Sequence, residues 1–124
     1  MTPPAPTTLV WAGLLCTPVM ISAGQILFKL AGNRIDGREA SGLAGLIQTL
    51  FDPFLLTAFA IYGSATVLWV YVLRYLTLSQ AYPFMALSFV LVPLASHVFF
   101  GETLGLRYWL GAALLISGMM VMNT

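Results

Sequence analysis

Four apolar stretches alternate with short polar segments along this chain of 124 residues. They cover residues 9–30, 53–75, 80–100 and 106–122. Each is continuously apolar and does not alternate at every second residue, so the pattern favours buried helices over strands with one wet face. A helix needs about 20 apolar residues to cross the hydrocarbon core of a bilayer. The pattern therefore predicts four transmembrane helices.

Helix-starting signals and short connections indicate how these helices follow one another. Asp52 precedes Pro53, which is typical of an N-cap followed by the first helical residue, and Ser79 stands in the same way before the third stretch. Residues 42–51 are apolar but too short to span, so we expect a short interfacial helix there. The second and third loops are very short, so neighbouring helices must be antiparallel. We expect an all-α fold, a four-helix up-down bundle forming one integral membrane domain over residues 1–124.

The composition supports this picture and excludes several classes of function. The chain is 60% hydrophobic and 7% charged, whereas a soluble domain carries about a quarter charged residues. The net charge of +1 gives no basic footprint for nucleic acid. Cys16 and His97 are single, and no nucleophile has a base beside it in the sequence. We therefore expect a membrane protein that is not an enzyme and holds no metal or cofactor.

The basic residues indicate how the bundle is oriented. In the predicted topology, Lys29, Arg34, Arg38 and Arg107 lie on the side of the first and third loops, and Arg74 alone lies on the side of the termini. Basic residues near helix ends favour the cytoplasm. The first and third loops should thus be cytoplasmic and the termini periplasmic. Four helices enclose little space for a bulky cargo, so we also expect a dimer.

Lys29 is the first candidate for chemistry, because it follows small and polar residues inside an apolar helix. Gln25 lies four residues before it and shares its helix face. An ionisable group in a spanning segment is costly and suggests a function. The alternative is that Lys29 only extends its ammonium group to the lipid headgroups at the helix end.

A second polar group lies in the turn before the fourth helix. Glu102 can contact a ligand headgroup, or it can cap the fourth helix or pair with Arg107. The predicted topology puts Lys29, Glu102 and Arg107 at one mouth of the bundle. Cations with one acid suit a ligand that carries a phosphate and polar groups.

The third and fourth helices carry the remaining candidates. Tyr82 belongs to an aromatic face of the third helix that can line a binding wall, although such a face is more often packing. Gly111 and Gly118 are seven residues apart and share a face of the fourth helix. Small residues let helices approach closely in membranes, so we expect a helix–helix contact there, within the subunit or in a dimer.

Three short motifs follow one another along the chain. They are Ala23-Gly24-Gln25 with Lys29, Ala81-Tyr82-Pro83, and Gly101-Glu102 before a glycine-spaced last helix. In this order and spacing they resemble the small members of the drug/metabolite transporter superfamily, which are EamA- and SMR-like, and most of all the ArnE/ArnF-type subunits. The likeness covers residues 19–122.

This resemblance implies a cargo, a location and partners. ArnE/ArnF-type subunits are implicated in flipping undecaprenyl-phosphate-linked aminoarabinose across the bacterial inner membrane for lipid A modification. By this likeness the protein flips a polyprenyl-phosphate-linked sugar between membrane lipids, as a homodimer or as a heterodimer with a similar small subunit. Lys29 and Arg107 would hold the phosphate, and Gln25, Glu102 and Tyr82 would contact the rest of the substrate.

Two other functions stay open at this point. The neighbouring small multidrug resistance exporters exchange protons for drugs through a glutamate in the first helix. Here Ile21 stands in its place, and Met85 replaces that family's tryptophan in the third helix. Both departures weigh against a proton-coupled cation exporter. A non-transporting membrane partner subunit would depend on helix packing and not on Lys29.

Overall fold

The computed structural model describes residues 8–35 and 42–124, and these two ranges hold helices and no strand. The elements are α1 (Thr8–Ile35), α2 (Gly42–Leu50), α3 (Pro53–Leu73), α4 (Leu78–Ala81), the 3₁₀ helix η1 (Tyr82–Leu87), α5 (Ser88–Phe100) and α6 (Leu106–Met122). The predicted all-α class is confirmed. The observed helices follow the four apolar stretches, with α1 continuing as far as Ile35 and the third stretch divided into three pieces.

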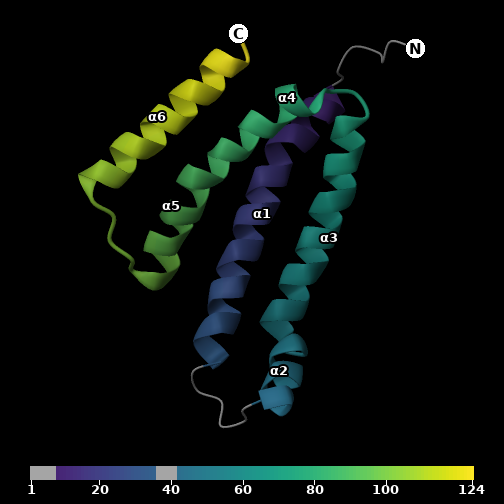
Figure 1. Cartoon of the computed structure of the whole chain (residues 1–124), viewed down its shortest axis with the longest axis vertical. Helices are drawn as coiled ribbons and strands as arrows, with labels where there is room; N and C mark the ends of the chain where they lie inside the picture. The colour runs from purple at the N-terminus through teal and green to yellow at the C-terminus, as the bar shows by residue number, and fades with distance from the viewer. Residues whose placement is uncertain (1–7, 36–41) are drawn as a thin grey trace.

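The pair formed by α1 and α3 is the most closely packed part of the molecule, and Figure 1 shows the two helices side by side and antiparallel. Their contact needs glycine on α1. A Cβ atom at Gly13 would lie 2.9 Å from Cγ2 of Val72, and one at Gly24 would collide with the ring of Tyr62. Buried apolar side chains close one end of the pair: Val10, Leu14, Val72, Leu76 and Ala81.

Asp52 joins the end of α1 to the start of α3. Its carboxylate accepts a hydrogen bond from the Phe54 amide at 2.9 Å, which confirms the predicted N-cap. The same carboxylate pairs with Arg34, with 3.0 Å between Nε and Oδ2. The Arg34 guanidinium also lies 5.1 Å from the centroid of the Phe54 ring. The ion pair was not expected, because sequence spacing alone does not bring Arg34 to Asp52.

The third apolar stretch is not one regular helix, and its predicted cap was wrong. Thr77, not Ser79, is the N-cap of α4, because Gln80 completes a reciprocal capping box with it: the Gln80 amide donates to Thr77 Oγ1, and the Thr77 amide donates to Gln80 Oε1. The α-helix then gives way to η1 at Tyr82–Leu87 before α5 begins. Pro83 has no N–H for an α-helical hydrogen bond, which favours the tighter 3₁₀ geometry here.

Three segments are long and apolar enough to cross a membrane: Thr8–Ile35, Pro53–Leu73 and Leu78–Phe100. The chain is therefore a membrane protein. The fourth apolar helix, α6, has 17 residues. At the rise of an α-helix it is about 25 Å long, shorter than the hydrocarbon core of about 30 Å. The fourth span stays a prediction, as does the dimer.

The last helix lies apart from the α1–α3 pair. It packs on η1 and α5, and Figure 1 shows it leaning away from α1 and α3. Ala112 is its one buried residue. The short helix α2 buries no side chain, and its Leu43 is 73% exposed. An interfacial position for α2 remains a prediction.

Candidate functional site

An exposed polar pair joins α1 and α3 beside their apolar contact. Gln25 Nε2 donates a hydrogen bond to the hydroxyl oxygen of Tyr62, with 2.6 Å between the two atoms. The Tyr62 ring lies against Gly24 and stacks on Phe28, with ring centroids 5.1 Å apart. Tyr62 was not singled out from the sequence. The signals available in the sequence were Tyr62 within the second apolar stretch and Gly24 beside Gln25 in the first apolar stretch.

Lys29 lies one helical turn after Gln25 on α1 and is exposed. Within the described part of the chain it makes no ion pair or hydrogen bond. If α1 is centred in the bilayer, Lys29 lies roughly 4 Å inside the hydrocarbon boundary. Its ammonium group is thus an uncompensated positive charge near one surface of the membrane.

The turn after α5 holds the only exposed acidic side chain of the described residues. Ser96 Oγ donates to the Glu102 carboxylate, and His97 Nδ1 lies 2.8 Å from the Glu102 carbonyl oxygen. Since a carbonyl only accepts, His97 carries its proton on Nδ1 here. Gly101 ends α5 in a left-handed conformation with φ +66°. Glu102 is therefore held by α5, and neither caps α6, whose N-cap is Gly105, nor pairs with Arg107.

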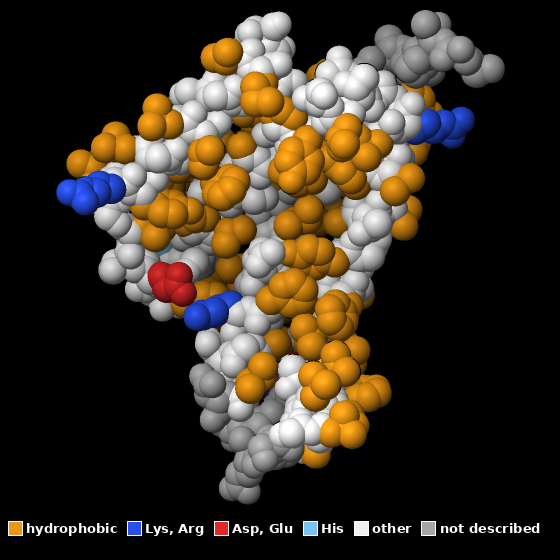
Figure 2. Space-filling view, in the orientation of Figure 1, with side chains coloured by type: hydrophobic (Ala, Val, Ile, Leu, Met, Phe, Trp, Pro, Cys, Tyr) orange, Lys and Arg blue, Asp and Glu red, His pale blue; other side chains and the backbone are white. Residues whose placement is uncertain are grey.

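The structure brings the helix ends that carry Lys29 and Glu102 to the same end of the molecule. Leu30 and Phe99 line one cavity of about 530 Å³ between α1 and α5. Lys29 precedes Leu30, and Glu102 follows Phe99 by three residues. In Figure 2 an acidic and a basic side chain lie close together on a face that is otherwise mostly apolar. This part of the expected site can act as a mouth for a charged headgroup.

Arg107 does not join this mouth. The residues Gly101–Gly105 are not helical and bring the chain back along α5 before α6 begins. The Tyr108 hydroxyl donates to the Phe89 carbonyl at 3.1 Å, and Phe89 is the midpoint of the span Leu78–Phe100. Arg107 lines a hollow with Phe89 and Tyr108. The structure therefore places Arg107 beside the middle of the third apolar span, away from Glu102.

Arg107 is also uncompensated, since no ion pair or hydrogen bond of it is found in ranges 8–35 and 42–124. An ionised side chain near the bilayer centre costs about 2.5–3.5 kcal/mol on insertion scales and marks a functional site by default.

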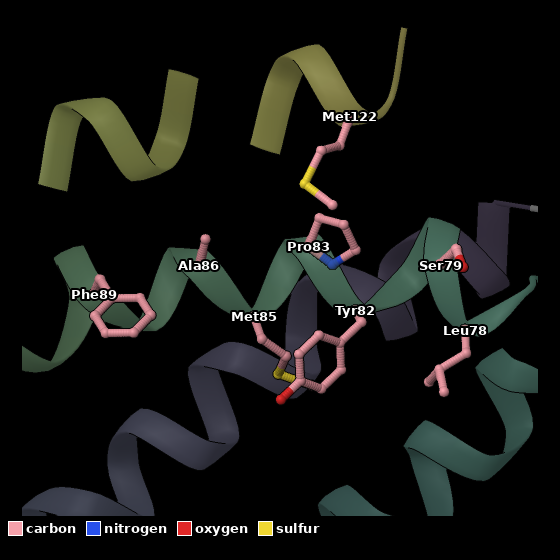
Figure 3. Close-up of a pocket in the computed structure, with 8 residues that line it drawn as sticks. All are labelled: Leu78, Ser79, Tyr82, Pro83, Met85, Ala86, Phe89 and Met122. Atoms are coloured by element: carbon pink, nitrogen blue, oxygen red, sulfur yellow. The ribbon is translucent and has the colours of Figure 1, made fainter. Parts of the chain in front are cut away.

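Tyr82 lies at the other end of the third span, far from Glu102 along the helix. It lines a hollow of about 570 Å³ with Leu78, Met85 and Met122. Figure 3 shows Tyr82 and Met85 pointing to one side of η1, while Met122 of α6 approaches Pro83 on the other. The five predicted substrate residues are thus spread along the length of the helices and do not form one cluster.

Gly111 and Gly118 face η1 across a hollow of about 370 Å³ that Pro83 and Ala86 also line. A Cβ atom at either glycine would meet no heavy atom within 4 Å. The close helix contact expected from their spacing is not made within the subunit. A contact in a dimer stays a prediction.

Comparison with known proteins agrees with the resemblance drawn from the motifs. A flippase subunit of Yersinia pseudotuberculosis serotype O:1b, named as probable 4-amino-4-deoxy-L-arabinose-phosphoundecaprenol flippase subunit ArnE, is 36% identical over 110 residues, or 89% of this chain and 92% of that protein. A protein with the same name from Aeromonas hydrophila is 37% identical over 89% of this chain and 93% of that protein. Another from Aeromonas salmonicida is 40% identical over 61% of this chain and 67% of that protein. No solved structure matches the chain.

A family model matches nearly the whole chain. The model of the EamA-like transporter family covers residues 3–124. The family and the relatives are transporters and flippase subunits and not enzymes. The chain therefore belongs to the EamA-like transporter family.

Proposed function

We propose that the protein is one subunit of a flippase that moves a polyprenyl-phosphate-linked sugar across the bacterial inner membrane. The observation that carries this proposal is a pair of uncompensated cations, Lys29 near one surface and Arg107 near mid-depth. A phosphate needs such groups when it leaves water. The names of the relatives support a lipid-linked aminoarabinose as cargo.

In this proposal the two cations act in sequence. Lys29 attracts the phosphate at the mouth, where the Glu102 carboxylate suits an amine on the sugar. Arg107 then holds the phosphate where hydration is lost, so that neither the phosphate nor the guanidinium stays unpaired. Gln25 and Tyr62 offer an amide and a hydroxyl at intermediate depth on α1 and α3.

The spans favour this cargo over a proton-exchanged cation. Residues 8–35, 53–73, 78–100 and 106–122 contain no Asp or Glu, so no membrane-embedded carboxylate can exchange protons for a cationic drug. The same ranges contain three basic residues, and two of them, Lys29 and Arg107, form no ion pair among the described residues, which favours an anion instead.

Lipid translocation in vesicles tests the proposal. The protein is reconstituted with a polyprenyl-phosphate-linked amino sugar in both leaflets, and a membrane-impermeant amine reagent is added outside. We expect the inner pool to become reactive at a rate that falls about tenfold or more in Lys29→Gln, because a charge-assisted contact to phosphate is lost.

Two variants serve as controls. Lys29→Arg keeps the charge and should keep most of the rate. Arg74→Gln removes an exposed charge at the end of α3, away from both cations, and should leave the rate unchanged. Equal rates in the native protein and Lys29→Gln would show that the first-helix lysine does not handle the phosphate.

A further inference from the structure

A long groove follows α6, where it packs beside η1 and the start of α5. Three adjoining hollows of about 570, 370 and 340 Å³ form it. The first two share Pro83, Ala86 and Met122, and the last two share Gly111 and Leu115. Because neighbouring hollows have lining residues in common, they adjoin one another along α6, and together we call them the α6 groove.

The α6 groove is charged at one end only. Arg107 and Tyr108 stand at the end near the middle of the membrane, and the Tyr108 hydroxyl is already bonded to Phe89. The opposite end, near Met122, offers only the neutral hydroxyls of Ser79 and Tyr82. The walls between the two ends are apolar. Such a distribution matches a long apolar molecule with one anionic end.

Open space remains along the groove beside the direct contact of α6 with η1. Two helices pack with their axes about 8–10 Å apart, and α6 already contacts η1 directly along the groove. The remaining space lies over Gly111 and Gly118, where an added Cβ atom would meet nothing within 4 Å. A hydrocarbon chain can occupy this space along the apolar walls.

We propose that the α6 groove binds the isoprenoid chain of a polyprenyl phosphate, with the phosphate at Arg107 and the chain lying toward Met122. This inference rests on the proposed function and adds where the lipid part of the substrate is held. The planar guanidinium can bind two phosphate oxygens at once, which fixes the position of the lipid in the groove.

Leucine at the groove glycines gives a direct test. Gly118→Leu and Gly111→Leu each place a side chain toward the groove from a position where the Cβ atom itself meets no heavy atom within 4 Å. Ala113→Leu is the matched control, because Ala113 is exposed on α6 and lines none of the three hollows. All three variants add the same side chain to the same helix.

The probe is a polyprenyl phosphate with a photoreactive diazirine in its chain, added to phosphatidylcholine vesicles that contain the full-length protein. We expect labelling of η1 and α6, competed by unlabelled polyprenyl phosphate and not by phosphatidylglycerol or polyprenol. Gly118→Leu should lower the labelling about tenfold, because apolar contacts to the isoprenoid chain are lost. In Arg107→Gln the labelling should no longer depend on the phosphate group of the lipid. Ala113→Leu should leave the labelling unchanged.

Three results would overturn the inference. Equal competition by phosphatidylglycerol would mean that the groove holds any anionic membrane lipid. Unchanged labelling in Gly118→Leu would mean that the chain lies elsewhere. Loss of a dimer in Gly118→Leu by native mass spectrometry, with labelling intact, would assign the groove to a second copy of the protein.

The translocation assay separates this inference from the proposed function. If the native protein translocates the lipid but the label lies outside the groove, the proposed lipid site in the groove is wrong and the proposed flippase function stands. If the label lies in the groove but the protein does not translocate the lipid, the proposed flippase function is wrong and the polyprenyl phosphate site stands.

Discussion

A single hydrogen bond between Gln25 and Tyr62 and the glycine beside it set how α1 meets α3. The Tyr62 ring occupies the space that any larger residue at Gly24 would fill, and this brings its hydroxyl to the Gln25 amide. The sequence showed Gln25 and Lys29 on one helix face, because that follows from their spacing. It did not show Tyr62, because the partner of a polar group on another helix depends on helix register, which one sequence does not reveal.

Gly24→Ala should destabilise the protein by about 1–3 kcal/mol, since the new Cβ collides with an aromatic ring that is packed on Phe28. Gly32→Ala on the same helix is the matched control, because a Cβ there meets nothing within 4 Å. Thermal unfolding in detergent, followed by circular dichroism, compares the two. Equal midpoints for Gly24→Ala and the native protein would contradict the close contact.

Tyr62→Phe should cost less, about 0.5–1.5 kcal/mol, because it removes one hydrogen bond and keeps the stacked ring. Tyr71→Phe is a suitable control, since the described structure gives the Tyr71 hydroxyl no such bond across helices. The same unfolding measurement applies. An unchanged unfolding midpoint in Tyr62→Phe would contradict the Gln25–Tyr62 bond.

Among the elements, the starts of helices were more predictable than their course. Asp52-Pro53 marked the start of α3 because the cap is a local feature of adjacent residues. The third stretch read as one helix because its residues are uniformly apolar, yet Pro83 makes part of it a 3₁₀ helix. The shared position of Lys29, Glu102 and Arg107 was expected from short loops, but Gly101–Gly105 brings the start of α6 to the middle of the third span.

The two roles of Asp52 can be separated by substitution. Asp52→Asn should keep the cap to Phe54 and lose the ion pair with Arg34, which is half-exposed, so we expect a loss below about 1 kcal/mol. Asp52→Ala should lose both, at a further cost of about 1 kcal/mol. Unfolding midpoints that rank native, Asn and Ala in that order support this division. An Asn variant as unstable as Ala would assign the whole effect to the ion pair.

For the whole molecule, the sequence indicated the environment more clearly than the arrangement. Sixty per cent hydrophobic residues and few charges made a membrane protein the expected class, and three long apolar helices agree with it. The position of α6 was not predictable, because an apolar helix carries no sign of which neighbour it will pack on when lipid is as apolar as its side chains. With Arg107 at mid-depth, the side of the first loop still holds three basic residues, Lys29, Arg34 and Arg38. The side of the termini holds one, Arg74, so the predicted orientation is unchanged.

A fusion at the C-terminus tests that orientation. We expect a periplasmic C-terminus, so that alkaline phosphatase fused after Thr124 is active and a fluorescent protein that folds only in the cytoplasm stays dark. The same pair of fusions within the first loop should give the opposite result. Bright fluorescence from the C-terminal fusion would mean that the termini are cytoplasmic and that the end of the molecule carrying Lys29 faces the periplasm.

The segment Gly101–Gly105 has a consequence for how many chains a working unit needs. It leaves the end of the third span and leads back to the level of Phe89, so we expect its peptide groups to lie at the depth of the acyl chains. Within the described structure the amides of Thr103 and Leu104 donate no hydrogen bond. Bare peptide groups facing hydrocarbon cost several kcal/mol each. We therefore expect this strip to be shielded by a neighbouring polypeptide, so that a solitary copy in lipid should be short-lived.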